Sequence, residues 1–222
     1  SPHSRRNLSA PNMTSSVITG IAVVERPRII DTSQPRSVWL DAGIYSGNPH
    51  QPLIANFRYW NDGGVEFGDG PIVCFIVATM QPHARVNSSV LSATDYDIVG
   101  DILQLIPAPG ADPAHSPFIF ACGQATNIQN NISMFDVLPT QYVSQLPLRQ
   151  PSNFPMRVEI PSSKRYESRG KPMPKNTDSR FHVQGFLKDV TRGADEVVQW
   201  FNVRLHNIVY FDRLPVPPIH SE

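Results

Sequence analysis

The chain has 222 residues, 40% of them hydrophobic, which is enough to bury the core of one large domain or two ordinary domains. Nineteen basic and nineteen acidic residues leave no net charge, so a general attraction to polyanions or to anionic membranes is excluded and any such binding must be local. The 22 prolines, about twice the average usage, would interrupt most long helices. We therefore expect an all-β protein.

Ten strand-like runs follow one another along the chain, separated by clusters of Pro, Gly, Asn and Asp. The first five are residues 17–25, 37–46, 52–60, 71–81 and 96–107. The second five are residues 118–126, 135–145, 154–160, 181–190 and 198–211. A segment rich in Pro, Ala and Gly lies between the two sets. We expect a flexible N-terminal segment, a first unit, a linker, a second unit and a C-terminal tail, at residues 1–14, 15–108, 109–117, 118–214 and 215–222.

The last two strands of each unit match best as an internal repeat. They read "GPIVCFIVATM" then "YDIVGDILQLIPAP" in the first unit, and "SRFHVQGFLKDV" then "WFNVRLHNIVYFDRLP" in the second. This resembles the fourth and fifth strands of the oligonucleotide/oligosaccharide-binding fold, the OB-fold, in which a "V-x-G-x-hydrophobic" strand precedes the closing strand. The second unit carries Gly185 in that pattern, whereas the first unit has Ile76 or Val77 in its place.

The resemblance is architectural, covers roughly residues 15–213, and is similar in layout to replication protein A. It implies two consecutive five-stranded Greek-key barrels with long Pro-rich loops. It also implies a single-stranded nucleic acid as the partner, with DNA placed before RNA.

The second and third strands alternate clearly between two faces. One face is uniformly apolar, which predicts that it points inward; its members are Val38, Leu40, Ala42, Ile44, Leu53, Ala55, Phe57 and Tyr59. The other face is mixed, and its members of interest are Trp39, Asp41, Tyr45, Asn56, Arg58 and Trp60. The resemblance makes this the ligand-facing side. We expect Trp39, Tyr45, Asn56, Arg58 and Trp60 to contact nucleic acid.

Other interpretations of this face are open. Its aromatic rings would stack on bases if the face is free, because every base has a flat π surface. They would pack on the other unit or on a protein partner if the face is covered, since Trp and Tyr are common in sheets for packing alone. A register slip of one residue would reverse every assignment.

A second local signal is a basic segment without apolar periodicity. Between residues 164 and 192 there are eight basic and three acidic residues, a net charge of +5 in a neutral protein. With Gly170, Pro172 and Pro174 it is predicted to be a mobile loop that cannot form a helix. We expect phosphate contacts from Lys164, Arg165, Arg169, Lys171 and Lys175 and a stacking contact from Tyr166. The alternative is a solvated loop that maintains solubility.

Signs of catalysis, metals and cofactors are absent from the sequence patterns. No H-E-x-x-H, G-x-S-x-G or phosphate-binding-loop motif occurs, so we expect no enzyme, no metal site and no cofactor. We interpret Asp95, Asp97 and Asp101 as surface carboxylates, and His182 and His206 as a solvent-facing pair on neighbouring strands. Cys74 and Cys122 lie in apolar runs, which favours buried free thiols over a disulfide.

The compartment and the remaining partners follow from weaker signals. No apolar run approaches the ~18 residues of a membrane span, and the first residues are polar, so we expect no membrane partner and an intracellular protein, with the nucleus as one candidate. Four Asn-x-Ser/Thr sequons, at Asn7, Asn12, Asn87 and Asn131, keep secretion open. The competing function is a non-enzymatic assembly, coat-like or protein-interaction module, with another protein subunit as the partner.

Overall fold

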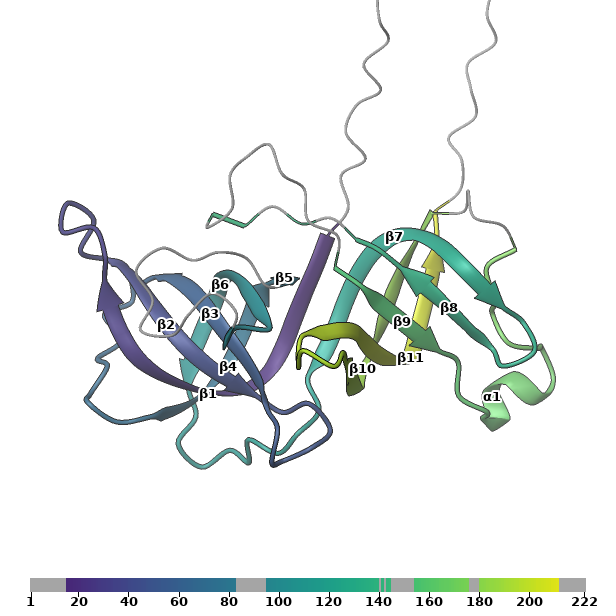
Figure 1. Cartoon of the computed structure of the whole chain (residues 1–222), viewed down its shortest axis with the longest axis horizontal. Coiled ribbons are helices and arrows are strands. Elements are labelled where there is room, and N and C mark those ends of the chain that lie inside the picture. The colour runs from purple at the N-terminus through teal and green to yellow at the C-terminus, as the bar shows by residue number, and fades with distance from the viewer. Residues whose placement is uncertain are drawn as a thin grey trace, which may run out of the picture.

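The computed structural model describes residues 15–82, 95–139, 141, 143–144, 154–175 and 180–211, and the regular secondary structure of these residues is almost entirely β-strand (Figure 1). The expectation of an all-β protein is confirmed. The described strands are β1 (Ser15–Ile29), β2 (Ser37–Ile44), β3 (Leu53–Trp60), β4 (Ile72–Thr79), β5 (Gln81–Pro82), β6 (Ile98–Pro107), β7 (Phe118–Gln129), β8 (Met134–Val137), β9 (Met156–Glu159), β10 (Arg180–Arg192) and β11 (Val198–Tyr210). The helix in this part of the chain is α1 (Lys164–Glu167), a single turn.

Five strands of the first half pair in a closed order, which we call the first circuit. β1 pairs with β2, β2 with β3, β3 with β6, β6 with β4, and β4 again with β1. The β3–β6 pairing is parallel and the other four are antiparallel. The short β5 pairs with the beginning of β6.

The second half repeats this order, and we call it the second circuit. β7 pairs with β8, β8 with β9, β9 with β11, β11 with β10, and β10 again with β7. Its parallel pairing, β9 with β11, again joins the third and fifth strands of the set. The predicted duplication of five strands therefore extends to the order of pairing.

The beginning of β1 joins the two circuits into one sheet. Residues 15–19 pair with residues 118–122 of β7, while residues 17–24 of the same strand pair with β4. One eleven-stranded sheet results, and β1 and β7 lie side by side at its centre (Figure 1). The predicted linker 109–117 connects β6 to β7 without interrupting this sheet.

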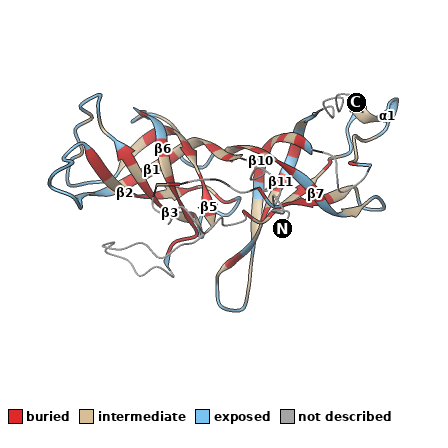
Figure 2. Ribbon diagram, turned by 90° about the horizontal axis from the view of Figure 1, so that it is seen from above, coloured by how far each residue is buried: buried red, intermediate tan, exposed pale blue. Residues whose placement is uncertain are grey.

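Alternating apolar residues place the core where the sequence predicted it. In β2 and β3 the inward set is buried, from Val38 and Leu40 to Phe57 and Tyr59. Buried and less buried residues alternate along most of the strands (Figure 2). The one-residue slip that would have reversed these faces is excluded, so the register prediction is confirmed.

Strand β8 is shorter than predicted. It ends at Val137 rather than at residue 145, two residues before Pro139. Proline has no amide hydrogen to donate to a neighbouring strand, so an apolar run that contains it need not continue the sheet. Of the predicted run beyond Val137, the described residues 138, 139, 141, 143 and 144 are not in a strand, and Val143 is buried.

Two glycines mark places where backbones approach closely. A Cβ built on Gly185 of β10 would lie 2.3 Å from the carbonyl oxygen of Arg204, next to a register shift between β10 and β11. In the first circuit the shift lies in β4 at Val77/Ala78, and Gly100 of the neighbouring β6 has the close approach, to the Thr79 carbonyl. In the first circuit the glycine at the close backbone approach therefore lies on β6, the strand paired with β4, and not on β4 itself.

Side chains also connect the two circuits. The guanidinium of Arg192 in β10 donates to both carboxylate oxygens of Asp97, over 2.7 and 3.0 Å. Asp97 also accepts the backbone N–H of Ile54 at 2.9 Å, and it is buried. The interpretation of Asp97 as a surface carboxylate is therefore wrong, because a distant arginine compensates its burial. Asp101 is also engaged, since the Ser144 backbone N–H donates to it at 2.6 Å.

The two cysteines are free thiols in different surroundings. Cys74 is buried, and burial raises the pKa of its thiol. Cys122 is only half-buried on the outward side of β7. The prediction of free thiols is confirmed for both, and the prediction of burial holds for Cys74 alone.

Candidate nucleic-acid interface

The outward side of β2 and β3 carries an arginine between two tryptophans. Arg58 lies directly opposite Trp39, and Trp60 lies opposite Ser37, which makes the two indoles diagonal neighbours. Trp60 is 47% exposed, while Trp39 and Arg58 are half-buried. The Ser37 hydroxyl accepts the Nε–H of Arg58 at 2.7 Å, which orients the guanidinium. These three side chains, which we call the tryptophan face, can offer stacking and a positive charge together.

Farther along the same outward side of β2 and β3, a buried polar cluster covers the sheet. Asp41 accepts two hydrogen bonds from Arg28, at 2.7 and 3.0 Å, one from the Tyr96 hydroxyl at 2.8 Å and one from Asn56 at 3.1 Å. Asn56 is fully buried in this cluster. The expectation that Asn56 contacts a ligand at the surface is therefore corrected, because Arg28 and Tyr96 cover this part of the sheet.

The cluster holds its acid in the charged form. Burial alone would raise the pKa of Asp41, but the hydrogen bonds from Arg28 and Tyr96 outweigh burial and lower this pKa below its usual value. The neighbouring carboxylate in turn raises the pKa of Arg28 against the effect of burial. The ion pair is thus a fixed structural element at the edge of the tryptophan face.

Tyr45 does not belong to the tryptophan face. It follows the end of β2, six residues from Trp39, which is about 20 Å along an extended strand. Its hydroxyl donates to the Gly47 carbonyl at 3.1 Å. Gly47 has a φ of 86°, and a Cβ on it would lie 2.1 Å from the carbonyl oxygen of Lys188. The loop after β2 therefore packs on β10.

The basic segment is folded where the structure describes it. Residues 164–167 form the one-turn helix α1, and Gly170, three residues after its end, has a φ of 74°. The expectation that this segment cannot form a helix is wrong, because Gly and Pro occur only after the turn is complete. Tyr166 and Met173 also pack against the core, which attaches the segment at two points.

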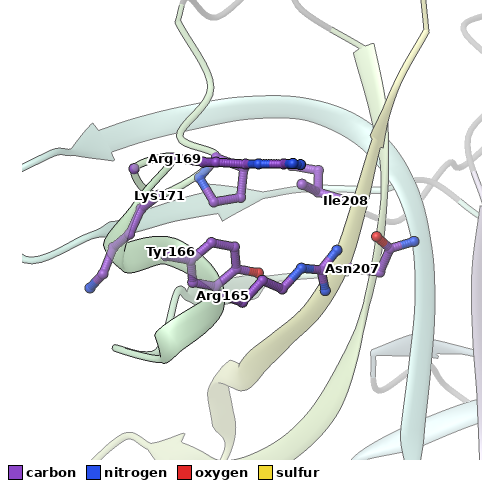
Figure 3. A pocket seen from close by; sticks show the side chains of 8 residues that line it. Arg165, Tyr166, Arg169, Lys171, Asn207 and Ile208 are labelled. Carbon is purple, nitrogen blue, oxygen red and sulfur yellow. The ribbon is translucent and has the colours of Figure 1, made fainter.

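Several basic side chains of this segment surround a pocket of about 440 Å³ (Figure 3). We call it the basic pocket, and its lining residues are Arg165, Tyr166, Arg169, Gly170, Lys171, Pro172, Asn207 and Ile208. No acidic residue is among them. Three cations and one phenol ring therefore meet in one hollow.

Contacts with the protein hold two of these cations in place. Arg165 donates to the carbonyl of His206 in β11 at 3.0 Å, and its guanidinium lies 5.7 Å from the Tyr166 ring centre. The ammonium of Lys171 donates to the Ile160 carbonyl at 3.1 Å. Arg169 is exposed. The pocket thus combines two anchored charges with an exposed one.

The remaining basic residues of the run are distributed differently. Lys164 and Lys175 are exposed outside the pocket. Lys188 donates to Glu159 at 2.8 Å, and Arg192 is paired with Asp97. The net charge of the run therefore overstates the charge that a phosphate chain could meet.

An arginine and the third tryptophan of the chain were missed by sequence reasoning. The guanidinium of Arg157 in β9 lies 4.3 Å from the ring centre of Trp200 in β11 and donates to Asp136 of β8 at 2.9 Å. Trp200 is half-buried. Arg157 lies on the third strand of its circuit, as Arg58 does, but Trp200 lies on the fifth strand, whereas Trp39 lies on the second. The only sequence signal of this pair was the outward position of Arg157 in "MRVE".

The histidines lie on neighbouring strands as predicted, but they are not equivalent. His182 stacks on Phe120, with ring centres 6.0 Å apart, and burial lowers the pKa of its imidazole. His206 is exposed and meets Phe118 and Phe186 edge-on. The interpretation as a solvent-facing pair therefore holds for His206 and is corrected for His182.

Within the described ranges, no three His, Cys, Asp or Glu side chains cluster as metal ligands would. In the same ranges, none of the helical structure has the length and apolar character needed to cross a bilayer. The sequons at Asn7, Asn12 and Asn87 lie outside the described residues, whereas Asn131 is exposed in the turn between β7 and β8.

No protein-family model matches the chain, and no curated protein matches its sequence. Among solved structures, the chain is similar to the wild-type single-stranded DNA binding protein from Thermus aquaticus, with a TM-score of 0.46 and 11% sequence identity. The superposition covers 91% of this chain and 95% of that one.

Proposed function

We propose that the chain is a non-enzymatic protein that binds single-stranded nucleic acid, with DNA before RNA. The observation that carries the proposal is the basic pocket, in which Arg165, Arg169 and Lys171 surround Tyr166 in a protein without net charge. Cations attract the phosphates and an aromatic ring stacks on a base, which is the combination that sequence-tolerant single-strand binding requires. The pocket offers both within a volume of about 440 Å³.

We further propose that each circuit is an OB-like barrel. Support comes from the pairing order, in which the first strand meets the second and fourth and the third meets the fifth in parallel. In OB-folds the second and third strands face the ligand. The tryptophan face occupies that side of the first circuit. We therefore propose that it binds a second stretch of the same single-stranded nucleic acid.

The proposal predicts a specific binding profile. Labelled oligo-dT, a matched oligo-U and a duplex would be titrated by fluorescence polarisation at two salt concentrations. We expect the protein to bind oligo-dT at least as tightly as oligo-U and much more tightly than the duplex. The affinity should fall as the salt concentration rises. Equal binding of duplex and single strand, or no binding at low salt, would contradict the proposal.

The second candidate is a protein-interaction module. It is favoured by half-exposed aromatic side chains outside both sites, including Phe118 and Phe186, whose rings meet at 4.7 Å on the outward side of β7 and β10. Exposed apolar patches of this kind mark partner surfaces. The two functions are compatible, because they use different faces.

A further inference from the structure

The segment that forms one side of the basic pocket is attached to β11 at two points. At the first point Arg165 donates to the His206 carbonyl over 3.0 Å, and at the second the Tyr210 hydroxyl donates to the Pro172 carbonyl over 2.9 Å. The part of β11 that lines the pocket, residues 207–208, lies between these two points. The hollow is therefore bounded at both ends along β11.

This arrangement limits what part of a nucleic acid can enter the hollow. The two attachment points lie four residues apart on β11, which is about 13 Å along an extended strand. A nucleic acid that ran along β11 would meet one of the attachments in either direction, whereas a chain end has to enter the hollow only once. The volume of about 440 Å³ lies in the lower part of the range of roughly 300–1,000 Å³ that small-ligand pockets have. The shape thus favours a terminal nucleotide over the middle of a chain.

Two arginines in the pocket are arranged to bind a phosphate group. Figure 3 shows the guanidiniums of Arg165 and Arg169 extending in the same direction, toward β11, one above the other. A guanidinium can donate two parallel hydrogen bonds to the oxygens of one phosphate. The attachment of Arg165 to β11 uses one of its five N–H groups, so Arg165 can bind a phosphate without releasing that attachment.

A terminal phosphate matches the charge of the pocket better than a phosphate inside the chain. An internal phosphodiester has two unbridged oxygens and one negative charge, whereas a terminal phosphate has three such oxygens and a charge of about −1.5 to −2 at pH 7. The pocket is lined by three cations and by no acidic residue. Arg165 and Lys171 donate to neutral carbonyls, which leave their positive charges uncancelled. We propose that the basic pocket binds the terminal phosphate of a single-stranded nucleic acid.

This inference rests on the proposed function and adds that an end of the bound chain is recognised. A phosphate at the 5′ end and one at the 3′ end offer the same chemistry to the two arginines, so the experiment has to separate them. Hydrogen bonds to charged groups are strong enough for a terminal phosphate to raise the affinity by about tenfold to hundredfold.

Three short oligo-dT probes test the proposal with the full chain. One carries a 5′-phosphate, one a 3′-phosphate and one a hydroxyl at both ends, and each has its fluorophore on an internal base. Fluorescence polarisation should show that one of the phosphorylated probes binds at least about tenfold more tightly than the hydroxyl probe, which identifies the end. If all three bind equally, this proposal is wrong and the proposed function stands. If none binds at low salt, both are wrong.

Matched arginine substitutions show whether the pocket causes the effect. Arg169 and Arg204 are both exposed, but Arg169 lines the pocket, whereas Arg204 lies on β11 outside it. In Arg169→Gln the affinity ratio of the preferred phosphorylated probe to the hydroxyl probe should fall toward one. In Arg204→Gln this ratio should stay as in the wild type. Equal ratios in the two variants, with both folded by circular dichroism, would overturn the proposal.

A second measurement uses a single nucleotide at constant ionic strength. Thymidine monophosphate, with its phosphate at the position that the preferred probe carries, should displace that probe, whereas thymidine should not. The displacement should weaken at least about tenfold in Arg169→Gln, because the phosphate loses one of its two arginines. Equal displacement by thymidine and its monophosphate, or displacement that Arg169→Gln leaves unchanged, would contradict binding of the phosphate in this pocket.

Discussion

Asp97 and Arg192, which are 95 residues apart in the sequence, form a two-bond ion pair between the first and second circuits. Their side chains are 10% and 14% exposed, so the pair is shielded from water and from salt. The carboxylate, through its hydrogen bond and charge, raises the pKa of Arg192 despite partial burial. The two circuits are therefore joined by charge as well as by the β1–β7 pairing.

Breaking this pair should destabilise the whole chain. Arg192→Gln leaves the Asp97 carboxylate without its main compensating charge, and we expect a loss of about 2–4 kcal/mol in the free energy of unfolding. Urea denaturation followed by tryptophan fluorescence and circular dichroism would measure it. Lys188→Gln is the control, because the Lys188–Glu159 pair is exposed and should contribute less than about 1 kcal/mol. Equal effects of both substitutions would contradict this prediction.

The tryptophan face should be a stacking site for bases. Trp60→Ala removes a 47% exposed ring, and we expect single-strand affinity to fall by about 1–3 kcal/mol with little change in stability. Trp39→Ala should weaken binding similarly and also cost some stability, because its ring is half-buried. Ile132→Ala, at a 50% exposed position in the β7–β8 turn, is the control. If the affinity for single-stranded nucleic acid is unchanged in both tryptophan variants, the stacking prediction is wrong and these rings serve only in packing.

The basic pocket should account for the salt dependence of binding. For single strands the slope of log affinity against log salt is about −0.7 per neutralised phosphate. Replacing Arg165, Arg169 and Lys171 together by glutamine should therefore flatten the slope by about two units. Lys188→Gln removes a charge from the same basic run but one that Glu159 neutralises, so the slope should stay the same. If the slope is unaltered in the triple variant, the prediction is wrong and this segment is solvated surface that does not contact phosphates.

Acid should weaken the fold through Asp41. Its pKa is lowered in the folded protein, so the unfolded chain binds the proton more readily. The resulting stabilisation is fully present above the unfolded pKa near 3.8 and is lost as pH falls through the lower folded value. Asp41→Asn should lower stability at pH 7 and flatten the dependence on pH below about 4. Denaturation at a series of pH values would measure this, and parallel curves for both proteins would refute it.

Much of the strand pattern was determined locally. Alternation in residues 37–60 is enough to assign Leu40 and Phe57 inward and Trp39 and Arg58 outward, because a strand has a period of two and only one face can be buried. The duplicated set of strands and the turn residues between them were readable for the same reason. These features depend on near neighbours in the chain, which the sequence displays directly.

Which outward residues are accessible was decided by tertiary structure alone. Asn56 and Arg58 point to the same side of β3, yet Asn56 is buried under Arg28 and Tyr96 while Arg58 reaches the surface. Likewise Asp97 is charged and buried because Arg192 reaches it from the other circuit, and Gly185 is required because the Arg204 carbonyl approaches it. Each outcome depends on a partner distant in sequence, so no local pattern of hydrophobicity or charge could specify it.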